Sequence, residues 1–128
     1  MDEQTQKPII MCIEQESTLL SLYSGILGGQ YQVMTELNSE KALETIKQRK
    51  EQGLPDISVL VTGGKMPGLC GWDLIKAVKQ IPGYESLPAV LCTAWISEEE
   101  GKKSGADYVL RKPFKSDELS DTIRTALE

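Results

Sequence analysis

Residues 59–68 read Val-Leu-Val-Thr-Gly-Gly-Lys-Met-Pro-Gly, an apolar run that leads into a glycine-rich loop. A short apolar run bounded by turn-forming residues is typical of a strand that is buried on both faces of a parallel sheet. The glycines and the proline that follow interrupt regular structure. We therefore expect a buried strand to end at Thr62 and the chain to turn over residues 63–68.

The same pattern recurs along the chain, where apolar runs alternate with segments of helical periodicity. The runs predict strands at 8–13, 31–35, 56–62, 87–93 and 108–111, and the periodic segments predict helices at 17–27, 39–52, 72–81 and 116–127. A fifth helical segment, residues 96–105, is polar and interrupted by Gly101, so it gives the weakest helical pattern. Alternating strands and helices imply right-handed crossovers and a parallel sheet covered on both sides, an α/β fold. Residues 1–128 are long enough for one such domain.

Hydroxyl and carboxylate residues precede three of the predicted helices. The expected N-caps are Ser17, Ser39 and either Ser116 or Asp117. Glycine and proline mark the helix ends at 28–29, 53–55 and 82–83.

The charge balance excludes several function classes. Fourteen Lys and Arg residues against 19 Asp and Glu give a net charge of −5, which argues against nucleic-acid binding by this domain. No apolar run approaches the ~20 residues that a membrane span needs. The first residues show no signal-peptide pattern, so we expect a cytoplasmic protein.

The chain also lacks the residues of common catalytic centres. It has no histidine, the commonest general base, and Cys12, Cys70 and Cys92 do not have metal-ligand spacing. Cys12 and Cys92 lie in predicted strands, where cysteine packs as a small hydrophobic residue. The stretch 63–65 is too short for a phosphate-binding P-loop. We do not expect an enzyme.

The ends of these strands together resemble the CheY-like receiver domain of bacterial response regulators. The matching residues are Met66, Pro67 and Gly71 after the third strand, Thr93 after the fourth, 105–107 before the fifth, and Lys112 and Pro113 after the fifth. The resemblance implies a flavodoxin-like sheet in the order 2-1-3-4-5, with all strand ends on one rim. It also implies a hydroxyl (Thr93) and an ammonium (Lys112) for phosphoryl oxygens, and a cis peptide bond between Lys112 and Pro113.

The departures from the family pattern fall on its reactive residues. Gly63 stands where the family has the aspartate that accepts the phosphoryl group, and Glu14-Gln15 replaces a pair of aspartates. Mg²⁺ requires oxygen ligands, so the loss of these carboxylates predicts weak or absent magnesium binding. Thr62 faces away if the strand alternates, Gly64 has no side chain, and Asp73 is expected to be an exposed acid at a helix start.

The residue at the family's switch position is Val109, where a Tyr or Phe is usual, and its neighbour Tyr108 is expected on the opposite side of the sheet. The segment from Thr93 to Lys112 is about three residues shorter than usual. Family members often bind partners through the fourth helix, the fifth strand and the fifth helix, and this face is therefore the expected contact surface.

Two interpretations of the rim remain open. Lys112 could form a salt bridge with Glu14, or Lys112, Lys65 and Thr93 could form an anion site. Trp95 could cover the rim or anchor a partner, and Trp72 is expected in the core. The favoured hypothesis is a receiver domain of two-component signalling that acts by protein–protein contact without phosphorylation. The alternative is a signalling module whose rim, Glu14, Gln15, Gly63, Lys65, Thr93 and Lys112, binds a small anion or metabolite.

Overall fold

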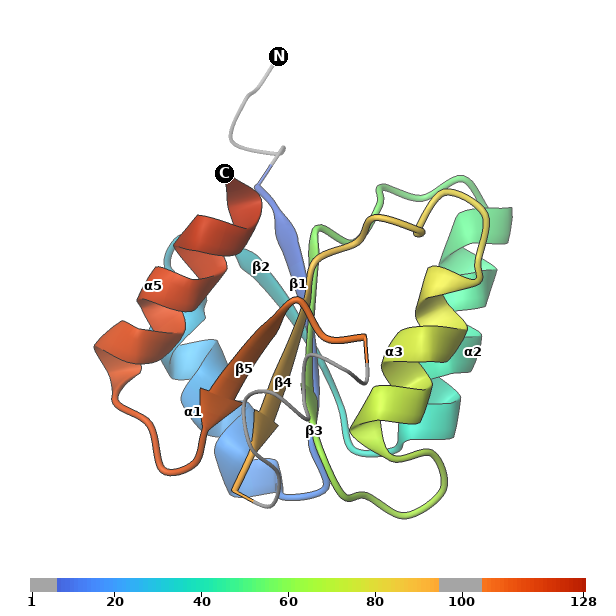
Figure 1. The fold of residues 1–128 in the computed structure, drawn as a ribbon. Helices are drawn as coiled ribbons and strands as arrows, with labels where there is room; N and C mark the ends of the chain where they lie inside the picture. The colour runs from blue at the N-terminus through green and yellow to red at the C-terminus, as the bar shows by residue number, and fades with distance from the viewer. Residues whose placement is uncertain (1–6, 95–104) are drawn as a thin grey trace.

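A computed structural model describes residues 7–94 and 105–128, which form a five-stranded parallel sheet between two layers of helices (Figure 1). The strands are β1 Ile9–Ile13, β2 Gln32–Glu36, β3 Val59–Gly63, β4 Ala89–Thr93 and β5 Tyr108–Arg111. The helices are α1 Ser17–Leu27, α2 Ser39–Glu51, α3 Gly71–Lys79 and α5 Ser116–Leu127. The strand order is β2-β1-β3-β4-β5, which confirms the predicted fold and topology.

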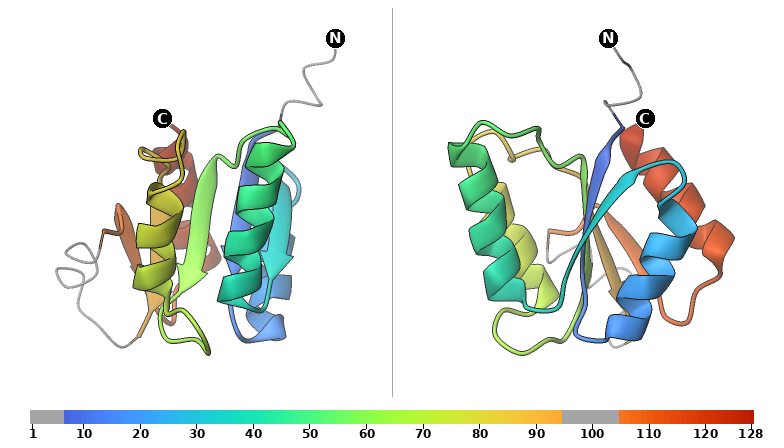
Figure 2. Two further views of the ribbon diagram at one scale, coloured as in Figure 1. Left: turned by 90° about the vertical axis from the view of Figure 1, so that its right-hand side faces the viewer. Right: turned by 180° about the vertical axis from the view of Figure 1, so that it is seen from behind.

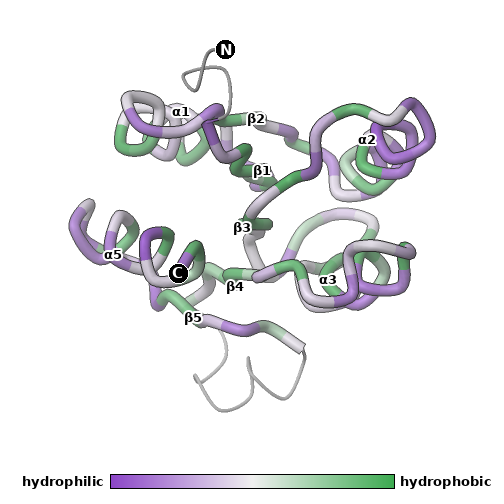
Figure 3. Tube along the Cα trace, turned by 90° about the horizontal axis from the view of Figure 1, so that it is seen from above, coloured by the Kyte–Doolittle hydropathy of each residue, from purple (hydrophilic) through white to green (hydrophobic). Residues whose placement is uncertain are grey.

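The helices divide into two pairs. α1 and α5 cover one face of the sheet, and α2 and α3 cover the other (Figures 1 and 2). Viewed from above, apolar positions of the helices turn toward the sheet (Figure 3). Alternate residues of each strand therefore enter different cores: Met11 packs with the α2–α3 side, whereas Ile10 and Cys12 pack with the α1–α5 side. Every residue of β1, β3 and β4 is buried, as expected for the centre of such a sheet.

Three predicted element boundaries were wrong by two or more residues, and several others, such as both ends of β2, were wrong by one. β3 begins at Val59 rather than at residue 56, because the Ile57 N–H donates to the Tyr84 hydroxyl at 2.9 Å instead of to the sheet. α3 ends at Lys79 rather than at residue 81, because the next two N–H groups donate to carbonyls three residues back. β4 begins at Ala89 rather than at residue 87, after a proline that has no N–H to donate.

The predicted N-caps were also wrong, by one residue at Ser17, Ser39 and Ser116 and by two at the alternative Asp117. Asn38 caps α2, and its Oδ1 accepts the Lys41 N–H at 2.9 Å. Ser39 is fully buried instead, and its hydroxyl donates to the Leu69 carbonyl at 2.7 Å, which ties α2 to the loop after β3. The N-cap residues of α1 and α5 are Glu16 and Lys115.

The weak helical pattern at 96–105 lies, except for Gly105, outside the described residues, as does Trp95. The fourth helix of the expected contact face therefore belongs to the same undescribed segment. Among the described helices, none combines the length and the apolar character needed to cross a membrane.

Candidate functional site

The carboxyl ends of the four strands β1, β3, β4 and β5 meet at one rim of the sheet, as the strand order requires. A small hollow of about 200 Å³ opens at this rim. Its lining residues are Glu14, Gln15, Glu16, Gly64, Lys65, Thr93, Ala94 and Lys112. The structure thus brings together five of the six residues predicted from the sequence. Gly63 is buried beneath the hollow at the end of β3.

Glu14 occupies the space that a side chain at position 63 would need. A Cβ atom built on Gly63 would stand 2.6 Å from Glu14 Oε1, 2.9 Å from its Cδ and 3.0 Å from its Oε2. The glutamate reaches this point because it directly follows β1, whose Ile13 pairs with Thr62 of β3. A carboxylate therefore stands close to the end of β3, although it comes from the neighbouring strand.

The carboxylate of Glu14 is 2% exposed and has two partners. Lys112 Nζ lies 3.1 Å from Oε1 and 3.0 Å from Oε2, and the Tyr23 hydroxyl donates to Oε2 at 2.8 Å. A buried charge is tolerated when it is paired and hydrogen-bonded in this way. The salt bridge between Glu14 and Lys112, one of the two interpretations from the sequence, is confirmed.

Tyr23 connects this ion pair to α1. Its side chain is fully buried, and its ring stacks on Phe114 with centroids 6.0 Å apart and planes at 8°. The pKa of Tyr23 is raised far above its usual value, mainly by burial and to a smaller extent by the nearby Cys92 and Glu14. The hydroxyl therefore stays protonated and acts as a donor. Burial also raises the pKa of Cys92 to about 12 and that of Cys12 further. Both cysteines are neutral core residues, as predicted.

Glycines allow the loop after β3 to fold closely back on the rim. A Cβ on Gly71 would fall 1.9 Å from the Gly63 carbonyl oxygen, so only glycine can occupy position 71 in this backbone. The Gly71 N–H donates to the Gly64 carbonyl at 2.6 Å and closes the loop. Thr93, 1% exposed, approaches the same loop, with its Oγ1 2.8 Å from a Cβ position on Gly64.

The other predicted residues lie as follows. Val109 packs in the α2–α3 core and Tyr108 in the α1–α5 core, which confirms that they face opposite sides of the sheet. Trp72 is partly buried against the α2–α3 core. Asp73 is exposed in the first turn of α3, as predicted. The Lys112–Pro113 peptide bond is cis.

Tyr23 is the site residue that sequence reasoning missed. Tyr23 lies within the predicted helix 17–27, and helical spacing shows that a side chain is buried but not what its hydroxyl contacts. The place of Glu14 was missed as well. The sequence offers no acid beside Gly63 along β3, and the substitute comes from across the sheet.

Few side-chain oxygens at the rim are available as ligands for a magnesium ion. Gln15 contributes an amide, Gly63 contributes no side chain, and both oxygens of Glu14 already have partners. Over residues 7–94 and 105–128, no three His, Cys, Asp or Glu side chains are grouped so that they could hold a metal ion.

Comparison with known proteins agrees with the fold. Residues 10–124 match the response regulator receiver domain family. The chain is 32% identical to the phosphate regulon transcriptional regulatory protein PhoB of Rhizobium meliloti (strain 1021), covering 94% of this chain and 52% of PhoB. It is 29% identical to histidine kinase P4 of Formosa agariphila, covering 96% of this chain and 9% of the kinase.

A solved response regulator receiver domain protein from Clostridium thermocellum superimposes with a TM-score of 0.81 at 27% identity, covering 94% of both chains. The chain thus spans about half of one of these curated relatives and a small part of the other. The match to the family covers nearly all of the present sequence, and the chain belongs to the response regulator receiver domain family.

Proposed function

We propose that this receiver domain acts as a protein–protein interaction module of two-component signalling without being phosphorylated. The observation that supports this most strongly is the position of Glu14, whose carboxylate fills the side-chain space at Gly63 and pairs with Lys112. In other family members the lysine at the position of Lys112 binds the phosphoryl group. Here the Lys112 ammonium pairs with the Glu14 carboxylate instead.

The end of β3 has no side chain that could accept a phosphoryl group. A phosphoryl acceptor must present a carboxylate oxygen to an incoming donor. Gly63 presents none, and the Glu14 carboxylate is 2% exposed with its two oxygens bound to Tyr23 and Lys112. Glu14 is therefore a structural replacement for the missing side chain and not a relocated acceptor.

Weak or absent Mg²⁺ binding is part of the same proposal. Phosphoryl transfer depends on a metal ion that neutralises the developing charge, and this ion needs several oxygen ligands in octahedral geometry. Gln15 has replaced one of the expected carboxylates and Gly63 another.

The alternative, a rim that binds a small anion or metabolite, has weaker support. Lys65, Thr93 and Lys112 do line one hollow. However, the carboxylates of Glu14 and Glu16 line it too, and Lys112 is already neutralised by Glu14. The hollow therefore has two acids and two lysines in its lining, and these balanced charges give an anion no net electrostatic attraction.

The proposal is tested by the intact mass of the protein after incubation with a small phosphodonor and Mg²⁺. We expect no added phosphoryl mass. An adduct that hydroxylamine removes would identify an acyl phosphate on a carboxylate and would refute the proposal. The Glu14→Gln variant is the matched control, because an adduct that it abolishes would assign the phosphate to Glu14.

A further inference from the structure

β2 forms one edge of the sheet, because its only strand neighbour within the described part of the chain is β1. The Gln32 N–H donates to the Pro8 carbonyl at 2.9 Å, so the backbone polar groups of Gln32 point toward β1. These groups point to opposite sides of a strand in alternate residues. Those of Val33 and Thr35 therefore point away from the sheet.

Val33 and Thr35 together present two N–H groups and two carbonyls at this edge. No hydrogen bond from the described residues reaches these four groups. On either side of them the outward N–H groups are bonded, that of Tyr31 to the end of α1 at 3.0 Å and that of Leu37 to a carboxylate of β2 at 3.1 Å. The unpaired groups thus form one short segment of the strand.

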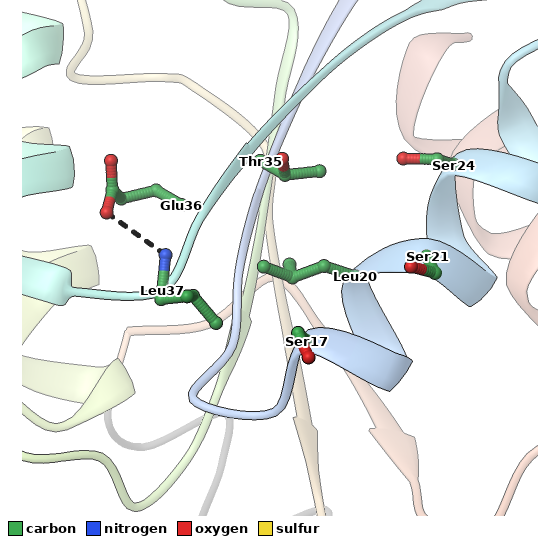
Figure 4. A pocket seen from close by; sticks show the side chains of 7 residues that line it. All are labelled: Ser17, Leu20, Ser21, Ser24, Thr35, Glu36 and Leu37. Carbon is green, nitrogen blue, oxygen red and sulfur yellow. Dashed lines mark hydrogen bonds between the residues drawn. The ribbon is translucent and has the colours of Figure 1, made fainter.

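This edge lacks much of the protection that exposed strand edges usually have. Charged side chains, prolines and bulges normally prevent an unpaired edge from binding another strand. The β2 sequence, Gln-Val-Met-Thr-Glu, contains no proline and one charged residue. That residue, Glu36, ends the strand, and in Figure 4 its side chain points away from α1. α1 itself contains no charged side chain.

A hollow of about 550 Å³ lies between α1 and the carboxyl end of β2 (Figure 4). Leu20 and Leu37 point toward each other across it, and Thr35 lies at its side. Serines at helical spacing form its α1 side, and their small side chains leave room that longer ones would fill. They are Ser17, Ser21 and Ser24. The volume is in the range of pockets that hold small molecules, and the hollow adjoins the unpaired groups.

We propose that the outer edge of β2 binds an extended segment of a partner protein, which adds a sixth strand to the sheet. A backbone in extended conformation repeats N–H and carbonyl groups at the spacing of Val33 and Thr35, so it can satisfy all four unpaired groups. Alternate side chains of this segment point to the α1 side of the sheet. The hollow between Leu20 and Leu37 receives one of them.

The charges around this edge determine which segment fits. The Glu36 carboxylate is bonded to two N–H groups, at 3.1 and 3.2 Å, and Glu16 at the start of α1 lines the two neighbouring hollows instead of this one. The exposed Lys41 and Glu44 belong to α2, on the other face of the sheet. The hollow therefore accepts an uncharged side chain. The net charge of −5 favours basic residues elsewhere in the segment.

This surface is separate from the contact face expected from the sequence, which lies at β5, the opposite edge of the sheet. The inference rests on the proposed function only in that the domain contacts a protein partner. Phosphorylation of a wild type that binds the peptide described below would refute the proposed function alone. An unphosphorylated wild type that does not bind the peptide would refute this inference alone.

An amide NMR titration with the peptide acetyl-Lys-Val-Thr-Val-Thr-Val-Lys-amide tests the inference. We expect the signals of Val33, Thr35 and Ser21 to shift as peptide is added. Thr35→Pro removes one outward N–H without removing a bond to β1, since proline is tolerated at such edge positions, and should raise the Kd at least tenfold. Thr35→Val keeps the N–H and is the matched control, with a Kd like that of the wild type.

Ser21→Phe is a second variant, which fills the hollow and leaves the backbone of β2 unchanged. It should also raise the Kd at least tenfold, and it replaces Thr35→Pro if circular dichroism shows that the proline variant is unfolded. Unshifted Val33 and Thr35 signals at millimolar peptide, or folded variants that bind like the wild type, would overturn the inference. Shifts of the same signals with protein concentration alone would assign the edge to a second copy and overturn it too.

Discussion

The Oε1 atom of Glu14 lies 2.6 Å from the point at which a Cβ atom on Gly63 would stand. The two residues are complementary: the Glu14 side chain, which directly follows β1, is accommodated because Gly63 at the end of β3 has no side chain. The same carboxylate binds Lys112 and Tyr23, so one substitution at position 63 disturbs three elements of the rim.

Adding a side chain at position 63 should therefore destabilise the fold. Gly63→Ala places a methyl group against the buried Glu14 carboxylate, and we expect a loss of about 1–3 kcal/mol in the free energy of unfolding, as for other overpacked sites. Gly29→Ala is the control, because a Cβ at Gly29 meets nothing within 4 Å. Urea denaturation measures both. Equal effects of the two substitutions would show that Glu14 does not fill the space at Gly63.

Restoring phosphorylation should require more than the missing aspartate. Gly63→Asp alone would place two carboxylates in contact and leave Gln15 in the metal site, so we expect no phosphoryl adduct. Adding Gln15→Asp supplies a second metal ligand and should help, and Glu14→Asp should help further by withdrawing the glutamate from position 63. Intact mass with a phosphodonor and Mg²⁺ measures each step. Strong phosphorylation of the single variant would contradict this explanation.

The ion pair should contribute measurably to stability. Lys112→Met leaves the Glu14 carboxylate buried with only Tyr23 as partner. We expect a loss of about 1–3 kcal/mol, below the ~3–5 kcal/mol of fully buried pairs because the Lys112 side chain is 25% exposed. Glu14→Gln in the same chain should recover part of the loss, which a double-mutant cycle quantifies.

Arg124→Met is the matched control for this cycle. It breaks the pair between Arg124 and Asp121 on α5, in which both side chains are 63% exposed. Exposed pairs contribute little, so its effect should be clearly smaller than that of Lys112→Met. An equal loss in the free energy of unfolding in the two variants would show that the pair of Glu14 and Lys112 stabilises the fold no more than an exposed pair does.

Stability should fall at alkaline pH. Cys12, Cys92 and Tyr23 have pKa values in the folded protein that lie above their usual values of 9.0, 9.0 and 10.0. At a pH above these usual values the unfolded chain loses protons that the folded chain retains. The contribution of these groups to the free energy of unfolding is therefore complete below about pH 9 and decreases as the pH rises. Each group adds a slope of about 1.4 kcal/mol per pH unit.

Cys92→Ala isolates one of these contributions. It should reduce the alkaline slope by about 1.4 kcal/mol per pH unit until the folded protein itself loses the proton, whatever its effect at neutral pH. Urea denaturation at a series of pH values up to 11 provides the slopes. An unchanged slope in the variant would show that Cys92 does not retain its proton in the fold.

The fold was predictable from the sequence because its signals are local and repeated. Apolar runs that end in Thr93 or in Lys112-Pro113 mark strand ends, and alternation with helices determines the parallel sheet. Element boundaries were less predictable, since the start of β3 depends on the hydroxyl of Tyr84, 27 residues away from Ile57.

The site was predictable only in part for the same reason. The pairing of Lys112 with Glu14 follows from two strand ends that share a rim. The entry of Glu14 into the space at Gly63 depends on side-chain length and on the spacing between neighbouring strands, which no motif encodes. The hydrogen bond from the Tyr23 hydroxyl joins α1 to Glu14, the residue after β1, and helical periodicity contains no information about it.

The most direct test of the central claim is an amide NMR spectrum of the wild-type protein before and after addition of Mg²⁺ and a small phosphodonor. The Glu14→Asp, Gln15→Asp, Gly63→Asp triple variant is measured in parallel. We predict that the amide signals of Gly64, Thr93 and Lys112 stay unchanged in the wild type and shift in the triple variant. Shifts of these signals in the wild type, with the mass of a phosphoryl group added, would contradict the claim that Glu14 and Lys112 replace phosphorylation.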